Sequence, residues 1–531
     1  MKEIKDLYFG FTDAENYKRK EDKEFFNQVF IKNQYLENLC SSSTSFLIGD
    51  KGTGKTAYAV YLTNNDYKNI RGDLKYIRET EYQKFITLKR DKHLQLSDYT
   101  QIWKISILLL LCDKIRNTET GLINKYVKFR TINEVIEEYY YKAFSPEILH
   151  TLEFVESSKL SAELLSKHAN IQAGESSNLT FTETRFQTNL LFIRKKFEDA
   201  LKQVRLNKDY VLFIDGIDIR PSEIPYDDYL SCIKGLANAV WELNNDFFPT
   251  IKGGKGKCRV VLLIRPDIYD NLGLQNQNAK IKDNSVYLDW KTHYSSYRSS
   301  NIFRVADKLL SVQQENSNLE LGESWDYYFP WDAKNVIDQF ENPTSFISFL
   351  RFSYHRPRDI ISLLNILQEN NRDTDGKTSF TSKDFESTEF QRSYSNYLLG
   401  ELKDQLSFYY KKEDYDVFLK FFEFLNGKDK FDFDYYINAY QNTLDFLNQS
   451  DIKPPQFMNN ANEFLQFLYN LNVLCYMEKT TDGKSHIHWC FRDRNYSNIS
   501  PKVKTGVEYQ IFYGLAKALN LGKQFKRDIS Q

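Results

Sequence analysis

The octapeptide Gly49-Asp50-Lys51-Gly52-Thr53-Gly54-Lys55-Thr56 constrains the fold of this chain more than any other segment. It fits the pattern G-x-x-x-x-G-K-[ST], in which a glycine-rich loop follows a buried strand and opens a helix. The flanks agree, because residues 45–48 are a short apolar run and residues 56–62 continue as a helix. Backbone N–H groups of such a loop, together with the helix N-terminus, face a phosphate. The segment therefore predicts an α/β fold that binds a nucleoside triphosphate.

The residues of this loop have separate expected roles. The ammonium group of Lys55 is expected to reach the β- and γ-phosphates, and the hydroxyl of Thr56 is expected to hold Mg²⁺. The backbone is expected to supply the remaining phosphate contacts, at Gly49, Gly52, Thr53 and Gly54. A glycine-rich surface turn, the alternative, does not account for the flanking strand and helix. The predicted cofactors are therefore ATP and Mg²⁺.

A carboxylate that could bind this Mg²⁺ closes the next apolar run, residues 210–215. The run is nearly continuous, as expected for a parallel strand that is buried on both faces. Asp215 ends it, where proteins with a phosphate loop place the carboxylate that holds the metal. The alternative role for Asp215 is a helix cap. Because a phosphate loop is already predicted, we interpret Asp215 as a catalytic residue and, with Thr56, as a metal ligand.

Asp218 is a further candidate for catalysis. Many related ATPases place a glutamate directly after the metal-binding aspartate to polarise water, but here that position is Gly216. Asp218 could do this from the next turn, or hydrolysis could be slow and depend on a partner. An exposed loop carboxylate is the alternative interpretation.

Arg265 ends another apolar run, residues 259–264. The carboxyl ends of parallel strands face the crevice in which nucleotides bind. We therefore expect its guanidinium group to contact the γ-phosphate as a third catalytic residue. The alternative is an ion pair with Asp267 or Asp270.

Two arginines precede or open a predicted helix in His355-Arg356-Pro357-Arg358-Asp359. Proline suits the first turn of a helix. A guanidinium group binds phosphate oxygens in a bidentate manner, so Arg356 or Arg358 is expected to reach the nucleotide from a lid. The sequence does not decide between them, and a purely structural role is the alternative.

Alternating strands and helices predict a parallel, doubly wound sheet in residues 1–290, with a helical insertion at about 113–205. A helical lid is expected at 291–410. A winged-helix-like domain is expected at 411–531, because three short helices precede a hairpin whose turn contains Asp482-Gly483. The predicted strands are 45–48, 82–88, 210–215, 259–264, 285–288, 473–478 and 486–491, and the predicted helices are 56–62, 99–115, 185–204, 226–244, 344–352, 357–370, 384–410, 414–425, 434–440 and 463–470.

These motifs together resemble the STAND/KAP/origin-recognition branch of AAA+-related P-loop ATPases. The loop, the 210–218 segment, Arg265, the Arg-Pro-Arg lid helix and the trailing winged helix occur in the same order. Within that branch the chain looks like bacterial ATPases that begin with a Phe-Gly…Asp-Ala-Glu segment, here at 9–15. The resemblance covers about 1–112 and 206–420 and, more loosely, the rest of the chain, whereas the insertion at 113–205 lies outside it. It implies a nucleotide-gated switch, often one in bacterial defence against phage, and the missing glutamate puts rapid turnover in doubt.

The expected winged helix has the wrong charge for a DNA reader. Residues 454–478, which cover its third helix and first wing strand, contain no Lys or Arg. Because phosphate contacts supply most non-specific affinity for DNA, packing against the ATPase domain or a partner is favoured. A contact through the wing remains the alternative, since basic residues follow at Lys484, Arg492, Arg494, Lys502 and Lys504.

Composition excludes several other classes of protein. A chain of 531 residues is too long for one core, and its net charge of −1 gives no general attraction to nucleic acid or to an anionic membrane. The six cysteines are scattered and show no metal-binding spacing, which suits reduced thiols in the cytoplasm. The N-terminus has no apolar signal region, and no apolar run is long enough to span a bilayer. We therefore expect a soluble, cytoplasmic protein.

Three functions are compatible with these features. The favoured one is an ATP-binding and ATP-hydrolysing switch that acts through self-association or a partner effector protein. The alternative is a DNA-binding or DNA-loading ATPase of the origin-recognition kind. A small-molecule kinase is disfavoured, because it would not need about 240 residues after the sheet.

Overall fold

The computed structural model describes residues 1–77, 96–118, 183–220, 224–315, 318–336, 340–479 and 485–522. The chain divides into two compact units. The α/β unit comprises Gln34–Asp50 and Lys55–Leu288, and the helical unit comprises Met1–Asn33, Lys51–Gly54 and Asp289–Gln531.

The α/β unit is built on a five-stranded sheet in which every neighbouring pair of strands is parallel. The strand order is β2-β3-β4-β1-β5. Strand β4 therefore lies between β1, which precedes the glycine-rich loop, and β3, which ends at Asp215. This confirms the predicted parallel α/β sheet. The strands are β1 (Phe46–Ile48), β2 (Ile70–Tyr76), β3 (Asp209–Asp215), β4 (Cys258–Ile264) and β5 (Ser285–Tyr287).

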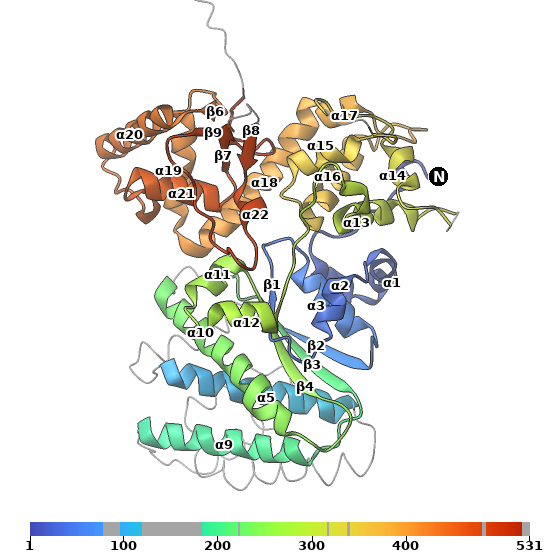
Figure 1. Cartoon of the computed structure of the whole chain (residues 1–531), viewed down its shortest axis with the longest axis vertical. Coiled ribbons are helices and arrows are strands. Elements are labelled where there is room, and N and C mark those ends of the chain that lie inside the picture. The colour runs from blue at the N-terminus through green and yellow to red at the C-terminus, as the bar shows by residue number, and fades with distance from the viewer. Residues whose placement is uncertain are drawn as a thin grey trace, which may run out of the picture. The chain divides into compact units, whose positions relative to one another are not determined.

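Helices cover both faces of this sheet (Figure 1). Helix α3 packs on β2, whereas α5 and α10 pack on β3 and β4, with α9 against α5. This is the arrangement expected when every parallel crossover is right-handed. The helices of the unit are α2 (Gln34–Leu39), α3 (Lys55–Asn64), α5 (Leu96–Thr118), α9 (Glu183–Gln203), α10 (Tyr226–Glu242), α11 (Pro266–Asn271) and α12 (Gln277–Asn284).

The close approach of α5 and α10 depends on one glycine. A Cβ atom added at Gly235 of α10 would lie 2.5 Å from the Cβ of Tyr99 on α5. Because atoms cannot approach so closely, a larger residue at Gly235 would push the two helices apart. The indole of Trp103 on α5 also donates a hydrogen bond to the Cys232 carbonyl, at 3.2 Å.

The second strand of the sheet differs from the sequence prediction. The predicted strand at 82–88 lies outside the described residues, and the described β2 is Ile70–Tyr76. Among the described strands, β2 lies at an edge of the sheet and pairs with β3 alone. Most of its side chains are therefore half-exposed, and its sequence lacks the continuous apolar run of an interior strand.

The first part of the helical unit has an aromatic core. Trp325 stacks on Phe329 with ring centroids 4.3 Å apart, and Phe346 and Phe349 meet Trp325 edge to face. The predicted helix at 384–410 is wrong in one respect, since it is broken at Ser387, whose side chain accepts a hydrogen bond from Phe390 N and caps α18. The α-helices here are α1 (Lys20–Val29), α13 (Asn301–Ser311), α14 (Glu323–Tyr328), α15 (Ser345–Phe352), α16 (Pro357–Glu369), α17 (Ser382–Glu386) and α18 (Thr388–Tyr409).

The C-terminal part of the helical unit contains the predicted three helices and antiparallel hairpin. The helices are α19 (Lys412–Glu423), α20 (Phe433–Gln449) and α21 (Ala461–Asn470), and the hairpin strands are β7 (Leu474–Lys479) and β8 (Ser485–His488). Two details correct the prediction. Residues expected to extend β8 form α22 (Cys490–Asp493), and the unpredicted strands β6 (Lys430–Phe431) and β9 (Glu508–Ile511) complete a sheet of order β6-β9-β7-β8.

Within the described ranges, no helix has both the length and the apolar character needed to cross a bilayer.

Candidate functional site

The glycine-rich loop has the backbone conformation that its sequence predicts. It follows the fully buried β1 and leads into α3, whose first residue is Lys55. Gly52 and Gly54 have φ values of 87° and 91°, a region that side-chain-bearing residues rarely adopt. The chain therefore curls between the strand and the helix, as a phosphate-binding loop requires.

The ammonium group of Lys55 lies on the loop itself. Its Nζ donates hydrogen bonds to the carbonyl oxygens of Gly49, at 2.8 Å, and Asp50, at 3.2 Å. The residue is only 8% exposed. Burial lowers the pKa of Lys55, whereas the charges of Asp218 and Asp215 oppose that change. The structure thus places the ammonium group of Lys55 near two carboxylates at this end of the sheet.

Thr56 and Asp215 meet at the carboxyl end of β3. The Thr56 hydroxyl donates a hydrogen bond to Asp215 Oδ2 at 2.6 Å. The other carboxylate oxygen, Oδ1, accepts a hydrogen bond from Gly216 N at 2.8 Å. Burial and then the neighbouring Asp218 carboxylate raise the pKa of Asp215 to about 6. The two predicted metal ligands are therefore brought together, although they come from distant parts of the sequence.

Asp218 lies in the turn that follows β3 and is half-buried. Its negative charge raises the pKa of both Lys55 and Asp215. The turn begins at Gly216, whose φ is 86° and where an added Cβ would lie 2.5 Å from the Ile77 carbonyl oxygen. A glutamate at position 216 would therefore be strained, which explains why the second carboxylate occurs two residues later.

Arg265 directly follows β4, precedes α11 and is 3% exposed. Its guanidinium group pairs with Asp267, with Nε donating to Oδ1 at 3.0 Å and Nη2 donating to Oδ2. One of the two alternatives weighed for Arg265, the ion pair with Asp267, is thus present. Its charge also contributes to the lowered pKa of Lys55. A contact of Arg265 with a γ-phosphate stays a prediction.

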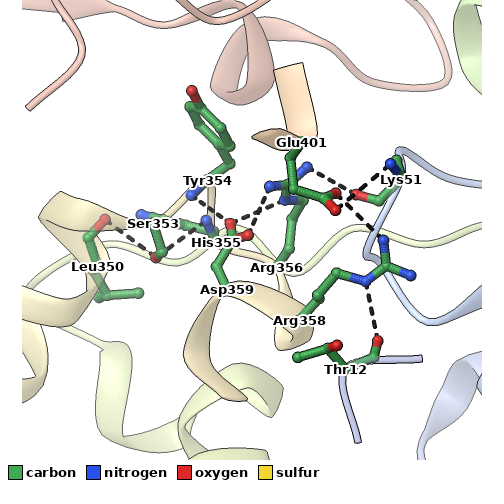
Figure 2. A network of polar contacts seen from close by, with 10 residues as sticks. All are labelled: Thr12, Lys51, Leu350, Ser353, Tyr354, His355, Arg356, Arg358, Asp359 and Glu401. Atoms are coloured by element: carbon green, nitrogen blue, oxygen red, sulfur yellow. Dashed lines mark hydrogen bonds and ion pairs between the residues drawn. The ribbon is translucent and has the colours of Figure 1, made fainter. Parts of the chain in front are cut away.

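Arg356 and Arg358 lie at the start of α16 in the helical unit, with Pro357 in the first turn. Figure 2 shows both guanidinium groups among protein partners. Arg356 binds the Asp359 carboxylate with Nε at 2.9 Å and Nη2 at 2.6 Å. Arg358 Nε donates to the Thr12 carbonyl at 3.1 Å and Nη1 lies 3.4 Å from a Glu401 oxygen. Their role as phosphate ligands stays a prediction.

The loop tip, residues 51–54, clusters with the helical unit rather than with the sheet. Lys51 Nζ lies 3.0 Å from Asp404 and 3.5 Å from Glu401, both on α18. Trp290 also contacts the tip, since its indole N–H donates to the Thr53 carbonyl at 2.8 Å. Sequence reasoning missed these contacts. Local sequence carried no signal for them, because each joins residues more than 200 positions apart.

The chemistry of the donor set suits Mg²⁺ bound together with a phosphate. A hydroxyl and a carboxylate are the oxygen ligands that Mg²⁺ prefers, and the ion usually takes its other ligands from phosphates and water. Within the described part of the chain, no group of three or more His, Cys, Asp or Glu residues could hold a metal by itself. A Mg²⁺ ion at Thr56 and Asp215 would take its other ligands from phosphates and water.

Comparison with known proteins gives one distant similarity. No protein-family model matches the chain. Among curated proteins, the chain is 23% identical over 368 residues to the "Putative transposon gamma-delta 80.3 kDa protein" of Escherichia coli (strain K12). The aligned region covers 67% of this chain and 46% of that protein. The chain thus spans about half the length of the curated relative that it matches.

Proposed function

We propose that this chain binds ATP with Mg²⁺ at the carboxyl end of its parallel sheet and hydrolyses it as a nucleotide-gated switch. One observation carries the proposal: the Thr56 hydroxyl lies 2.6 Å from the Asp215 carboxylate, directly beside a glycine-rich loop that ends in Lys55. A surface turn would not bring a second strand end, a buried lysine and two carboxylates to the same loop. These contacts support a P-loop ATPase site, and the resemblance to the AAA+-related branch supports the same proposal.

Each residue of the site has a role in this account. The backbone of Gly49, Gly52, Thr53 and Gly54 and the ammonium group of Lys55 bind the phosphates, while Thr56 and Asp215 would hold Mg²⁺. When bound, the ion neutralises charge on the phosphate oxygens. Asp218 orients a water molecule through its carboxylate oxygens, and Arg265 contacts the γ-phosphate after exchanging its bond to Asp267.

The C-terminal part of the helical unit is assigned to signalling. Its three helices and hairpin have the order of a winged helix, and we propose that this domain contacts a partner protein or a second copy of the chain. The resemblance stated above also makes defence against phage the proposed context.

A DNA-acting ATPase is the second candidate. The similarity to a protein described as belonging to a transposon favours it. Helix α21, which would enter the major groove in a DNA-reading winged helix, carries no Lys or Arg. Binding of a labelled DNA duplex that strengthens with ATP and weakens with salt would support the second candidate over the switch.

Calorimetric titration with ATP in the presence of Mg²⁺ tests the proposed site. The wild type should bind, and Lys55→Ala should lose most of the affinity, because the phosphates would lose a buried cation. Lys68→Ala is a matched control, since Lys68 is an exposed lysine of the same unit that pairs with Glu37. Equal binding by Lys55→Ala and the wild type would contradict the proposal.

A further inference from the structure

Three consecutive carbonyl groups of the loop tip each accept a hydrogen bond from the helical unit. The donors come from two segments, the start of α16 and the residues that follow β5. They are Arg356 Nη1 to Lys51 O at 2.9 Å, the Arg358 backbone N to Gly52 O at 3.3 Å, and Trp290 Nε1 to Thr53 O at 2.8 Å. We call these three hydrogen bonds the loop clamp.

Arg356 is rigidly held for this contact. Its guanidinium group forms two hydrogen bonds with Asp359, whose side chain is fully buried and also accepts a hydrogen bond from Tyr354 N (Figure 2). Burial alone would lower the pKa of Arg356, but the charge and hydrogen bonds of Asp359 raise it above its ordinary value. Two of its nitrogens are therefore committed to Asp359, and Nη1 is the one that donates to the loop.

Trp290 is buried, and the residues that follow it are tied to other segments of the unit. The residue is 7% exposed. The next residue, Lys291, donates from Nζ to the carbonyl oxygens of Arg492, at 3.1 Å, and Arg494, at 2.7 Å. The backbone N of Thr292 donates to Nδ1 of His355 at 3.4 Å, which ties this segment to the one that carries Arg356. The donors of the loop clamp thus belong to one cross-linked set of residues.

A fixed carbonyl also fixes the direction of an N–H group. A trans peptide unit is planar, so the C=O of one residue and the N–H of the next point in opposite directions. The loop clamp holds the carbonyls of residues 51, 52 and 53 toward its donors on Arg356, Arg358 and Trp290. The N–H groups of Gly52, Thr53 and Gly54 therefore point away from these donors. Such successive N–H groups are what a phosphate-binding loop presents to its ligand.

We propose that Arg356 and Trp290 are positioning residues, which orient the loop N–H groups for the phosphates that ADP and ATP share. This inference rests on the proposed function. It differs from the expectation that Arg356 binds the γ-phosphate, because a γ-phosphate ligand affects ATP alone, whereas an oriented loop affects both nucleotides.

The test compares Trp290→Phe and Arg356→Lys with the wild type. Trp290→Phe keeps an aromatic ring but removes the donor to Thr53, and Arg356→Lys keeps a cation for Asp359 but cannot also reach Lys51 in the same geometry. Arg372→Ala is the matched control, because Arg372 is an exposed arginine of the same unit that takes no part in the loop clamp. Affinities for ADP and for ATP are measured by calorimetry with Mg²⁺. Trypsin cleavage after Lys51 is measured in nucleotide-free protein.

We expect Trp290→Phe and Arg356→Lys to weaken ADP and ATP binding by the same factor, about tenfold, which corresponds to one hydrogen bond. Cleavage after Lys51 should be several-fold faster in both variants and unchanged in Arg372→Ala. A loss confined to ATP, or no change in either affinity, would overturn the inference. If the wild type binds neither nucleotide, the proposed function fails, and the cleavage rates still decide whether the clamp holds the loop.

Discussion

The hydroxyl of Thr56 lies 2.6 Å from carboxylate oxygen Oδ2 of Asp215, although 159 positions separate the two residues in the chain. The parallel sheet explains this proximity. Thr56 is the second residue of the helix that follows β1, and Asp215 is the last residue of β3. Since the carboxyl ends of parallel strands share one edge of the sheet, both side chains reach the same place.

Asp218 should contribute to hydrolysis more than to binding. A carboxylate that orients or deprotonates water accelerates a reaction by about 10²–10⁴-fold, so Asp218→Asn should lower kcat by at least about tenfold with little change in ATP affinity. A phosphate-release assay with parallel calorimetry measures both. Asp246→Asn, at an exposed position of the same unit, is the control. A proportional loss of affinity and turnover would show that Asp218 has another role.

Arg265 should distinguish ATP from ADP. If its guanidinium group contacts the γ-phosphate, Arg265→Ala weakens ATP binding and leaves ADP binding unchanged. The same variant removes the partner of the half-buried Asp267 and should lower the free energy of unfolding by about 1–3 kcal/mol. Chemical denaturation and nucleotide titration separate the two effects. If Arg265→Ala lowers the free energy of unfolding but leaves ATP binding unchanged, the ion pair with Asp267 is the whole function of Arg265.

His355 should make the helical unit sensitive to acid. Burial, and after it the positive charges of Arg492, Lys291 and His293, lower the pKa of His355 well below 6.5. The unfolded chain therefore binds a proton below pH 6.5 that the folded chain does not, so stability falls as the pH drops through that value. From pH 7 to pH 5 the loss should be about 1–2 kcal/mol.

The control for this acid sensitivity is His355→Asn. His355 has a φ of 53°, and asparagine tolerates that conformation while lacking a titratable group. Denaturant melts of the wild type and of this variant at pH 5 and pH 7 make the comparison. An equal pH dependence in both proteins would assign the acid sensitivity to other groups.

ATP and ADP should give different protection from amide hydrogen exchange in residues 331–500. A ligand shifts a conformational equilibrium only through contacts that differ between the states, and the γ-phosphate is the group that only ATP supplies. We expect differences equivalent to about 1–3 kcal/mol, as is typical of coupled sites. The comparison uses wild-type protein with a non-hydrolysable ATP analogue and with ADP. Identical exchange patterns would show that the helical unit does not respond to the nucleotide.

The parts of the fold that the sequence predicts best are those with strong local patterns. Strands β3 and β4 are continuous apolar runs that are buried along nearly their whole length, and each was predicted to within a residue or two. Strand β9 was missed because it has only four residues and alternates Glu508, Tyr509, Gln510 and Ile511. A strand this short is recognised only by its pairing with β6 and β7.

In the candidate site, too, local sequence patterns were predictable and tertiary contacts were not. The sequence motif made Lys55 and Thr56 candidates, and the end of an apolar run made Asp215 a candidate, because both features are local; their roles stay predictions. The contact of Trp290 with Thr53 joins residues 237 positions apart and follows from tertiary packing alone. The partners of Arg356 were likewise not predictable, since a buried guanidinium group binds carboxylate, carbonyl and phosphate oxygens alike.

The measurement that tests the central claim most directly is the effect of Mg²⁺ on ATP affinity in the wild type, Thr56→Val and Asp215→Asn. If the two side chains hold the ion, Mg²⁺ strengthens ATP binding by the wild type at least about tenfold, and each variant loses most of that gain. Affinity without Mg²⁺ should change little in either variant, which also shows that the fold is retained. ATP binding by the wild type that is absent, or that is indifferent to Mg²⁺, would contradict the account.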